Sequence, residues 1–193
     1  MVFVYSKVLK TSGFHGKGYL KLEATRLKKD SSFGLALRTF QPNAIVLLAN
    51  GIIQKITADD GKNYENKIIS NDVETGKSLG EERKRESYYS VSLVEGRAEV
   101  RINAGTGVIT LVSQKLCNDG RFHSIRVVKM GRKLELRVDD ELQSSSALPE
   151  GGITVKAKYL YLGGLPEKID GSIYVSDTTP FVGTIKDLLF NNA

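Results

Sequence analysis

Short runs in which apolar and polar residues alternate recur along the chain, with Gly, Asn, Asp or Pro between them. This two-residue period is typical of β-strands with one buried face. We expect strands over residues 3–9, 19–22, 33–40 and 45–48, with turns at 13–18 and 41–43. The run 45–48 is apolar throughout, which predicts burial on both sides. No long helical period and no internal repeat occurs, so the pattern predicts an all-β protein.

Residues 88–107 predict a hairpin centred on Glu95 and Gly96. Pairing outward from this turn gives three apolar pairs on one face: Leu93 with Ala98, Val91 with Val100, and Tyr89 with Ile102. The other face carries the polar pairs Ser92 with Glu99 and Ser90 with Arg101. A slip of one residue would expose the apolar set, so the pattern specifies which side chains face the core.

Residues 118–140 predict a second hairpin, centred on Met130 and Gly131. The expected inner pairs are Val127 with Leu134, Ile125 with Leu136, and His123 with Val138. The expected outer pairs are Val128 with Lys133, Arg126 with Glu135, and Ser124 with Arg137. Ribbons that are apolar on one side bury that side against each other, which predicts an antiparallel β-sandwich. We expect a single domain over residues 1–193.

Residues 56–86 interrupt the alternation and predict a long loop, which is uncommon in a compact domain. From Asp59 to Glu86 this segment holds six basic and eight acidic residues, so the positive excess belongs to the predicted strands. The run Arg83, Lys84 and Arg85 is either a solvated part of the loop or a processing site or partner contact, because exposed loops are preferred cleavage sites.

The overall composition fits a soluble globular domain, with 193 residues, 40% apolar and 26% charged. No apolar run is long enough to span a bilayer. The net charge of +6 either serves solubility or attracts a polyanion. Met1 is followed by Val-Phe-Val-Tyr without a signal-peptide pattern, so we expect an excised domain if the protein is secreted.

Catalytic chemistry finds little support in the residue pattern. A glycosidase needs two carboxylates across a cleft, but Glu135 is expected to face outward opposite Arg126, and residues 139–141 fit a turn. His123 lies on an apolar face and is expected to be a hydrogen-bonded structural histidine. The lone cysteine, Cys117, excludes an internal disulfide and is expected to be a partly buried free thiol, with a bridge outside this segment as the alternative.

We therefore expect no enzyme, no cofactor and no metal. Nucleic acid binding is also not expected, because a single-strand platform needs exposed aromatics among basic residues. Tyr88 is the only outward-facing aromatic residue that can be assigned on the first hairpin.

Five segments in order resemble the laminin G-like domain family. They are residues 13–22 (GFHGKGYLKL), 33–50 (FGLALRTFQPNAIVLLAN), 119–125 (DGRFHSI), 159–166 (YLYLGGLP) and 181–188 (FVGTIKDL). The resemblance covers nearly the whole chain and is greatest to laminin α chains. It implies a jelly-roll sandwich, related to concanavalin-like folds, in a secreted protein of the extracellular matrix or basement membrane. It also implies a non-catalytic adhesion module.

The resemblance further implies that the chain binds integrins together with neighbouring modules of the same chain, or binds sulfated glycans such as heparan sulfate. The alternative is an architectural spacer that positions its neighbours and has no ligand of its own.

The sequence departs from the family pattern in three ways. Thr184 stands where many members have a cysteine, and Phe122 stands where tryptophan is usual. The two aspartates of the family's calcium site would align near Ser87 and between Val155 and Ala157, where this chain has no acid. Since calcium needs carboxylate oxygens, we expect no calcium there, and binding of dystroglycan that depends on it is in doubt.

Basic residues on or beside the second predicted hairpin and the strand after it are the candidates for binding a sulfated glycan. They are Arg121, Lys129, Arg132, Lys133, Arg137, Lys156 and Lys158. Dispersed solubilising charge is the alternative explanation for each of them.

Overall fold

The structure is a computed structural model that describes residues 5–54 and 85–192. Within these residues the chain forms strands and one short 3₁₀ turn, Gly171–Ile173. The strands are β1 Tyr5–His15, β2 Leu20–Glu23, β3 Asp30–Arg38, β4 Ala44–Gln54, β5 Arg85–Val94, β6 Arg97–Ala104, β7 Val108–Leu116, β8 His123–Met130, β9 Lys133–Val138, β10 Glu141–Ala147, β11 Tyr159–Leu162 and β12 Val182–Asn192.

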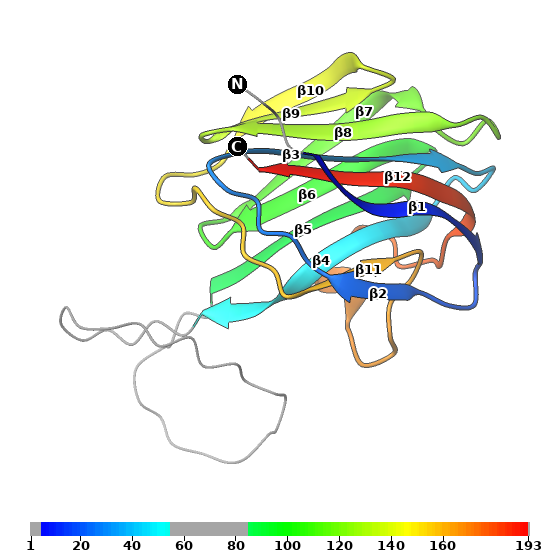
Figure 1. Ribbon diagram of the computed structural model, residues 1–193, viewed down its shortest axis with the longest axis horizontal. Helices are drawn as coiled ribbons and strands as arrows, with labels where there is room; N and C mark the ends of the chain where they lie inside the picture. The colour runs from blue at the N-terminus through cyan, green and yellow to red at the C-terminus, as the bar shows by residue number, and fades with distance from the viewer. Residues whose placement is uncertain (1–4, 55–84, 193) are drawn as a thin grey trace.

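Two six-stranded sheets pack face to face (Figure 1). The first sheet has the order β1-β12-β3-β8-β9-β10, and the second has the order β2-β11-β4-β5-β6-β7. Neighbouring strands in both sheets are antiparallel. The predicted all-β sandwich is confirmed.

The hydrophobic core lies between the inner faces of the two sheets. The alternation of apolar and polar residues along the strands directs the apolar side chains into it. In β3, Phe33, Leu35 and Leu37 are buried while their neighbours in the strand are less so. Phe33 contacts Tyr89 of the second sheet with ring centroids 5.1 Å apart, so an aromatic pair joins the sheets. The run 45–48 is fully buried, as its apolar sequence predicts.

The first predicted hairpin, now β5 and β6, has the expected register. Tyr89 pairs with Ile102, Val91 with Val100 and Leu93 with Ala98. The turn residues Glu95 and Gly96 both have positive φ, 52° and 78°. A two-residue turn of this kind matches the twist of the flanking strands.

The second predicted hairpin, β8 and β9, has the expected faces but a register two residues away from the prediction. Val127 pairs with Leu136 and Ile125 with Val138, around a turn at Gly131 and Arg132. An even shift keeps each side chain on its face, so alternation could not distinguish the two registers. As a result, Glu135 lies opposite Val128 and not Arg126.

The outer face of the second sheet is covered, which the polar pairs of the first hairpin did not predict. Residues 165–175 lie over it, and Val175 packs with Ile45, Leu48 and Tyr88 in a small second core. Ser90 and Ser92 are buried, and the hydroxyl of Ser90 donates to the carbonyl oxygen of Tyr174. Tyr88 does point outward from the sheet, but it is buried and is not an exposed aromatic.

Candidate functional site

Lys129, one of the predicted glycan-binding residues, is buried with 2% of its surface exposed. It shares the inner face of β8 with Ile125 and Val127. Its ammonium donates to the backbone oxygens of Lys28 and Lys29, both at 2.9 Å, and of Gly131 at 2.8 Å. Burial lowers the pKa of Lys129. This side chain links residues 28–29 to the turn between β8 and β9 and cannot reach a ligand in solution.

The predicted basic residues of β9 lie around one carboxylate. Glu135 accepts from Lys133 at 2.8 Å and from Arg137 at 3.1 Å, and these two hydrogen bonds lower its pKa. Arg132 lies 3.3 Å from Glu150. Exposed pairs of this kind contribute little stability, and each cation here already has an acidic partner.

Arg121 is exposed in the loop before β8, and its Nε lies 4.0 Å from a carboxylate oxygen of Asp119. Arg83 and Lys84 lie outside the described residues. Arg85 is the first residue of β5, and the structure describes only its backbone.

A basic and aromatic surface forms where β2 pairs with β11, and we call its residues Lys21, Lys158 and Tyr159 the Tyr159 site. The Lys21 Nζ lies 3.9 Å and the Lys158 Nζ 5.1 Å from the centre of the Tyr159 ring. The hydrogen bond from Lys158 and then its charge lower the pKa of the Tyr159 phenol, with smaller contributions from Lys21 and Lys168. Cations near an aromatic ring in this way are favourably placed.

Tyr19 extends this surface and packs against the buried Tyr161. Tyr19 is exposed and its ring meets Tyr161 edge to face, with centroids 5.7 Å apart. The sequence indicated that these side chains face outward, because they alternate with the apolar residues Leu20, Leu22, Leu160 and Leu162. What the sequence could not supply is that β2 and β11, far apart in the chain, are neighbours.

The rim where the family would bind calcium holds a hydrogen bond in place of carboxylates. The Ser87 hydroxyl accepts from the backbone N–H of Lys156 at 2.8 Å. Val155 and Ala157 on either side are buried. Among the described residues there is no group of three or more His, Cys, Asp and Glu side chains that could hold a metal ion.

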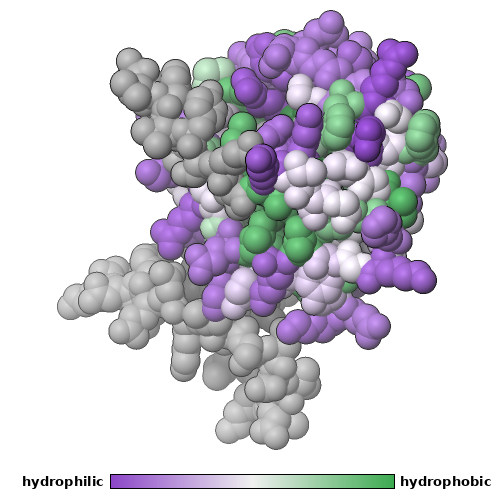
Figure 2. All heavy atoms as spheres, turned by 45° about the vertical axis from the view of Figure 1, so that its right-hand side comes forward, coloured by the Kyte–Doolittle hydropathy of each residue, from purple (hydrophilic) through white to green (hydrophobic). Residues whose placement is uncertain are grey.

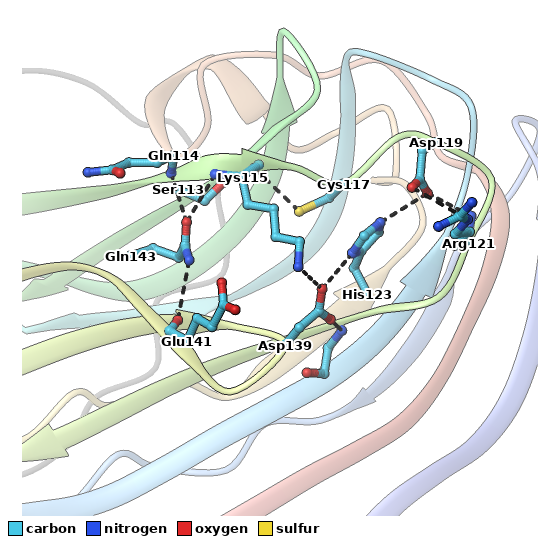
Figure 3. A network of polar contacts seen from close by, with 11 residues as sticks. Ser113, Gln114, Lys115, Cys117, Asp119, Arg121, His123, Asp139, Glu141 and Gln143 are labelled. Atoms are coloured by element: carbon cyan, nitrogen blue, oxygen red, sulfur yellow. Dashed lines mark hydrogen bonds and ion pairs between the residues drawn. The ribbon is translucent and has the colours of Figure 1, made fainter.

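His123 lies in a network of polar contacts that joins the two sheets (Figure 3). Its Nδ1 is 2.8 Å from Asp139 and its Nε2 is 3.0 Å from Asp119. Asp139 also pairs with Lys115 of β7 at 2.8 Å. Burial opposes the charged imidazole, but the hydrogen bonds to Asp139 and Asp119 outweigh it and raise the pKa of His123. The prediction of a hydrogen-bonded structural histidine is confirmed.

Cys117 lies beside this network as a buried free thiol. Burial raises its pKa to about 11, so the nucleophilic thiolate is scarce near neutral pH. Its sulfur donates to the carbonyl oxygen of Lys115 at 3.8 Å. Gln143 of β10 accepts from the N–H groups of Gln114 and Lys115 at 3.1 and 3.0 Å, which fastens the two sheets along the same edge.

No described residue belongs to a helix long and apolar enough to cross a bilayer. The described residues form an antiparallel β-sandwich with a basic and partly aromatic surface where β2 pairs with β11.

The sequence model of the laminin G domain matches residues 71–193, and the chain belongs to this family. Laminin subunit alpha-1 of Homo sapiens is 26% identical over 192 residues, which are 95% of this chain and 6% of that protein. Neurexin-3a of Danio rerio is 22% identical over 182 residues, 91% of this chain and 10% of that protein. The chain therefore spans a small part of either relative.

Solved structures show the same fold. Domains LG4-5 of the mouse laminin alpha1 chain match with a TM-score of 0.66 at 18% identity, over 95% of this chain and 44% of that one. The LG1-3 region of the laminin alpha2 chain also matches with a TM-score of 0.66, at 17% identity, over 93% of this chain and 30% of that one. The matching family is that of a non-catalytic binding module, and no enzyme family is indicated.

Proposed function

We propose that this chain is an adhesion module of a secreted extracellular matrix protein, and that it binds a sulfated glycan such as heparan sulfate through the Tyr159 site. The observation that supports this is the placement of Lys21 and Lys158 beside one tyrosine ring without an acidic partner among the described residues. Sulfate groups would meet the ammonium groups, and the ring would pack against the sugar. Lys156, two residues before Lys158, would extend the site.

The extracellular setting is inferred from the relatives. One is a laminin subunit, and another is named a basement membrane proteoglycan of Caenorhabditis elegans, 30% identical over 110 residues, which are 55% of this chain and 3% of that protein. A receptor such as an integrin would be engaged together with neighbouring modules. Arg121, Arg132, Lys133 and Arg137 would then add to the general attraction of a polyanion and would not form the site itself.

Heparin affinity chromatography tests the glycan proposal. The chain should be retained above physiological ionic strength, about 0.15 M, and should elute as salt screens the exposed cations. The double variant Lys21→Gln with Lys158→Gln should elute at clearly lower salt. Arg132→Gln with Lys133→Gln removes the same charge elsewhere and should change elution less.

Two outcomes would contradict this assignment. Elution of the unaltered chain below physiological salt would rule out the proposed glycan binding. An equal decrease in the elution salt of both double variants would indicate that dispersed charge, and not the Tyr159 site, binds heparin. If the isolated chain binds no glycan but a multi-module fragment binds a receptor, the spacer function is the better explanation.

We further propose that the rim near Ser87 binds no calcium, since the described residues there supply lysines and a committed hydroxyl. A ligand that binds only the folded state raises the temperature of unfolding. Millimolar calcium should therefore leave the Tm unchanged, and a rise would contradict the proposal.

A further inference from the structure

An open cleft of about 570 Å³ lies at the end of the sandwich where β3 ends and β12 begins. Its walls include Phe40, Pro42, Gly120 and Val182. Phe40 is 80% exposed and Val182 43% exposed, which is high for apolar side chains. Figure 2 brings this end of the molecule toward the viewer and shows apolar side chains exposed among hydrophilic ones.

Hydrogen bonds fix the backbone around the exposed Phe40 ring. A side chain at Gly120 would collide with the Phe40 ring, so the ring lies directly against this glycine. The N–H of Gly120 donates to the carbonyl oxygen of Thr39 at 3.0 Å, and the N–H of Gly96 donates to that of Pro42 at 2.7 Å. Preorganised walls reduce the entropy that a ligand must lose on binding.

The polar side chains of the cleft are already committed to internal hydrogen bonds. The Thr39 hydroxyl donates to the carbonyl oxygen of Val182 at 2.6 Å and accepts from the N–H of Gln41 at 3.0 Å. The Gln41 amide accepts from the N–H of Val182 and donates to the carbonyl oxygen of Pro180. The cleft therefore offers a ligand apolar contact and few hydrogen bonds, which suits a peptide side chain better than a sugar.

Arg38 lines the cleft and Lys186 lies beside the same Phe122 ring, and neither cation has an acidic partner among the described residues. The Lys186 Nζ lies 4.1 Å and the Arg38 guanidinium carbon 4.9 Å from the centre of the Phe122 ring. Asp119, the acid of the adjoining loop, hydrogen bonds to His123 and to the N–H of Arg121. A carboxylate that approaches Arg38 and Lys186 would therefore meet uncompensated positive charge.

The geometry points to this cleft as a docking site for an acidic peptide segment of another protein, in which an apolar side chain stands next to Asp or Glu. The apolar side chain packs on Phe40 and Val182, and the carboxylate faces Arg38 and Lys186. This site is separate from the Tyr159 site and does not depend on the glycan proposal.

The position of the cleft favours such a partner. Arg38 pairs with Thr184 at one end of β3, whereas Ser31 pairs with Asn192 at the other end. At about 3.3 Å per residue these ends are roughly 23 Å apart. Tyr5, where β1 begins, pairs with Asn191 near the end of β12, and Figure 1 shows this end of the two strands on the side away from the cleft. A module joined at either terminus would attach on that far side.

The test pans the full chain against random 12-residue peptides displayed on phage and measures the selected peptides by fluorescence polarisation. The enriched peptides should carry Asp or Glu within two positions of a large apolar residue. Phe40→Ser and Lys186→Glu should each weaken a selected peptide by about tenfold, because the first truncates the apolar contact and the second reverses the charge that faces the peptide carboxylate. Leu142→Ser and Arg126→Glu change matched exposed residues elsewhere and should leave the affinity nearly unchanged.

Phe40 and Lys186 are on the surface, so unaltered Tm values would show that the variants are folded. Peptides that lack the acidic and apolar pair, or that bind Phe40→Ser as tightly as the unaltered chain, would overturn the proposal. The proposal would also be overturned if panning enriched no peptide and Lys186→Glu eluted from heparin at lower salt than the unaltered chain. Arg38 and Lys186 would then bind a glycan. Failure of the Tyr159 site variants to alter heparin elution would leave the peptide result unaffected.

Discussion

Two buried titratable side chains in β8 are accommodated in different ways. Lys129 has no carboxylate partner within residues 5–54 and 85–192, and its ammonium donates to three backbone oxygens. His123 lies between the carboxylates of Asp119 and Asp139. A buried polar group is tolerated only when its hydrogen bonds are made, so in each case the partners explain the burial. Alternation along β8 could have shown from the sequence that Lys129 faces inward with Ile125 and Val127.

Replacing Lys129 by Met tests whether its ammonium stabilises the corner between residues 28–29 and the β8–β9 turn. The variant keeps the aliphatic length but removes three donated hydrogen bonds, so unfolding should become easier by about 1–3 kcal/mol. Urea unfolding measures the change. Lys133→Met removes an exposed lysine of the next strand and should cost less. Equal stability of Lys129→Met and the unaltered chain would show that the three contacts contribute nothing net.

His123 predicts a stability that depends on pH. Because its pKa is raised in the folded chain, its contribution is fully present below the unfolded value, about 6.5, and is lost as pH rises through the folded pKa. Asp139 affects stability at the acidic end of the pH range. Burial opposes its charge, but Lys115, His123 and the N–H of Ser124 lower its pKa to about 2, so its contribution is lost as pH falls toward that value.

The variant His123→Asn should therefore lose most stability, about 1–3 kcal/mol, between roughly pH 4 and 6. The loss should shrink above neutral pH. Urea unfolding across this range gives the comparison, and His15→Asn, which changes an exposed histidine, is the control. A loss that stays constant with pH would mean that the imidazole is not charged in the folded state.

At the level of the elements, hydrophobic alternation predicted which residues face inward but not always which residues pair. In β5 and β6 the residues Glu95 and Gly96 gave the correct centre. In β8 and β9 the centre lies one position later than predicted, because Gly131 takes a positive φ of 59° at the first position of the turn. The preference of turn residues, and not the buried face, decides between registers that differ by two.

Gly131→Ala tests this role of the turn. A residue with a side chain is strained at positive φ by about 1–2 kcal/mol, and open space around Gly131 leaves no clash to confuse the result. Gly13→Ala is the matched control, since Gly13 also has open space but lacks a positive φ. Thermal unfolding should show a lower Tm for Gly131→Ala alone. Similar Tm values for both variants would contradict a conformational requirement at Gly131.

For the molecule as a whole, the sandwich and its core followed from the sequence, but the layer over the second sheet did not. Residues 165–175 lack a strand period and are placed by contacts with Ile45, Leu48 and Tyr88, which lie far away in the chain. The Tyr159 site was predicted only in part: Lys158 was a candidate, but Lys21 and Tyr159 were not, because their approach needs the pairing of β2 with β11. The basic residues were visible in the sequence, whereas their acidic partners depended on the register.

Val175→Ala tests how far the covering layer stabilises the molecule. The buried Val175 side chain loses two methyl groups, at about 0.8 kcal/mol each, and leaves a small cavity over Tyr88. We expect a loss of about 1–2 kcal/mol in urea unfolding, compared with little change for the exposed Val108→Ala. Because Tyr174 meets Tyr88 edge to face at 5.0 Å, the tyrosine near-UV circular dichroism should also change. Unchanged stability with an altered tyrosine signal would mean that the layer detaches without weakening the sandwich, and the two sheets alone would then carry the stability of the domain.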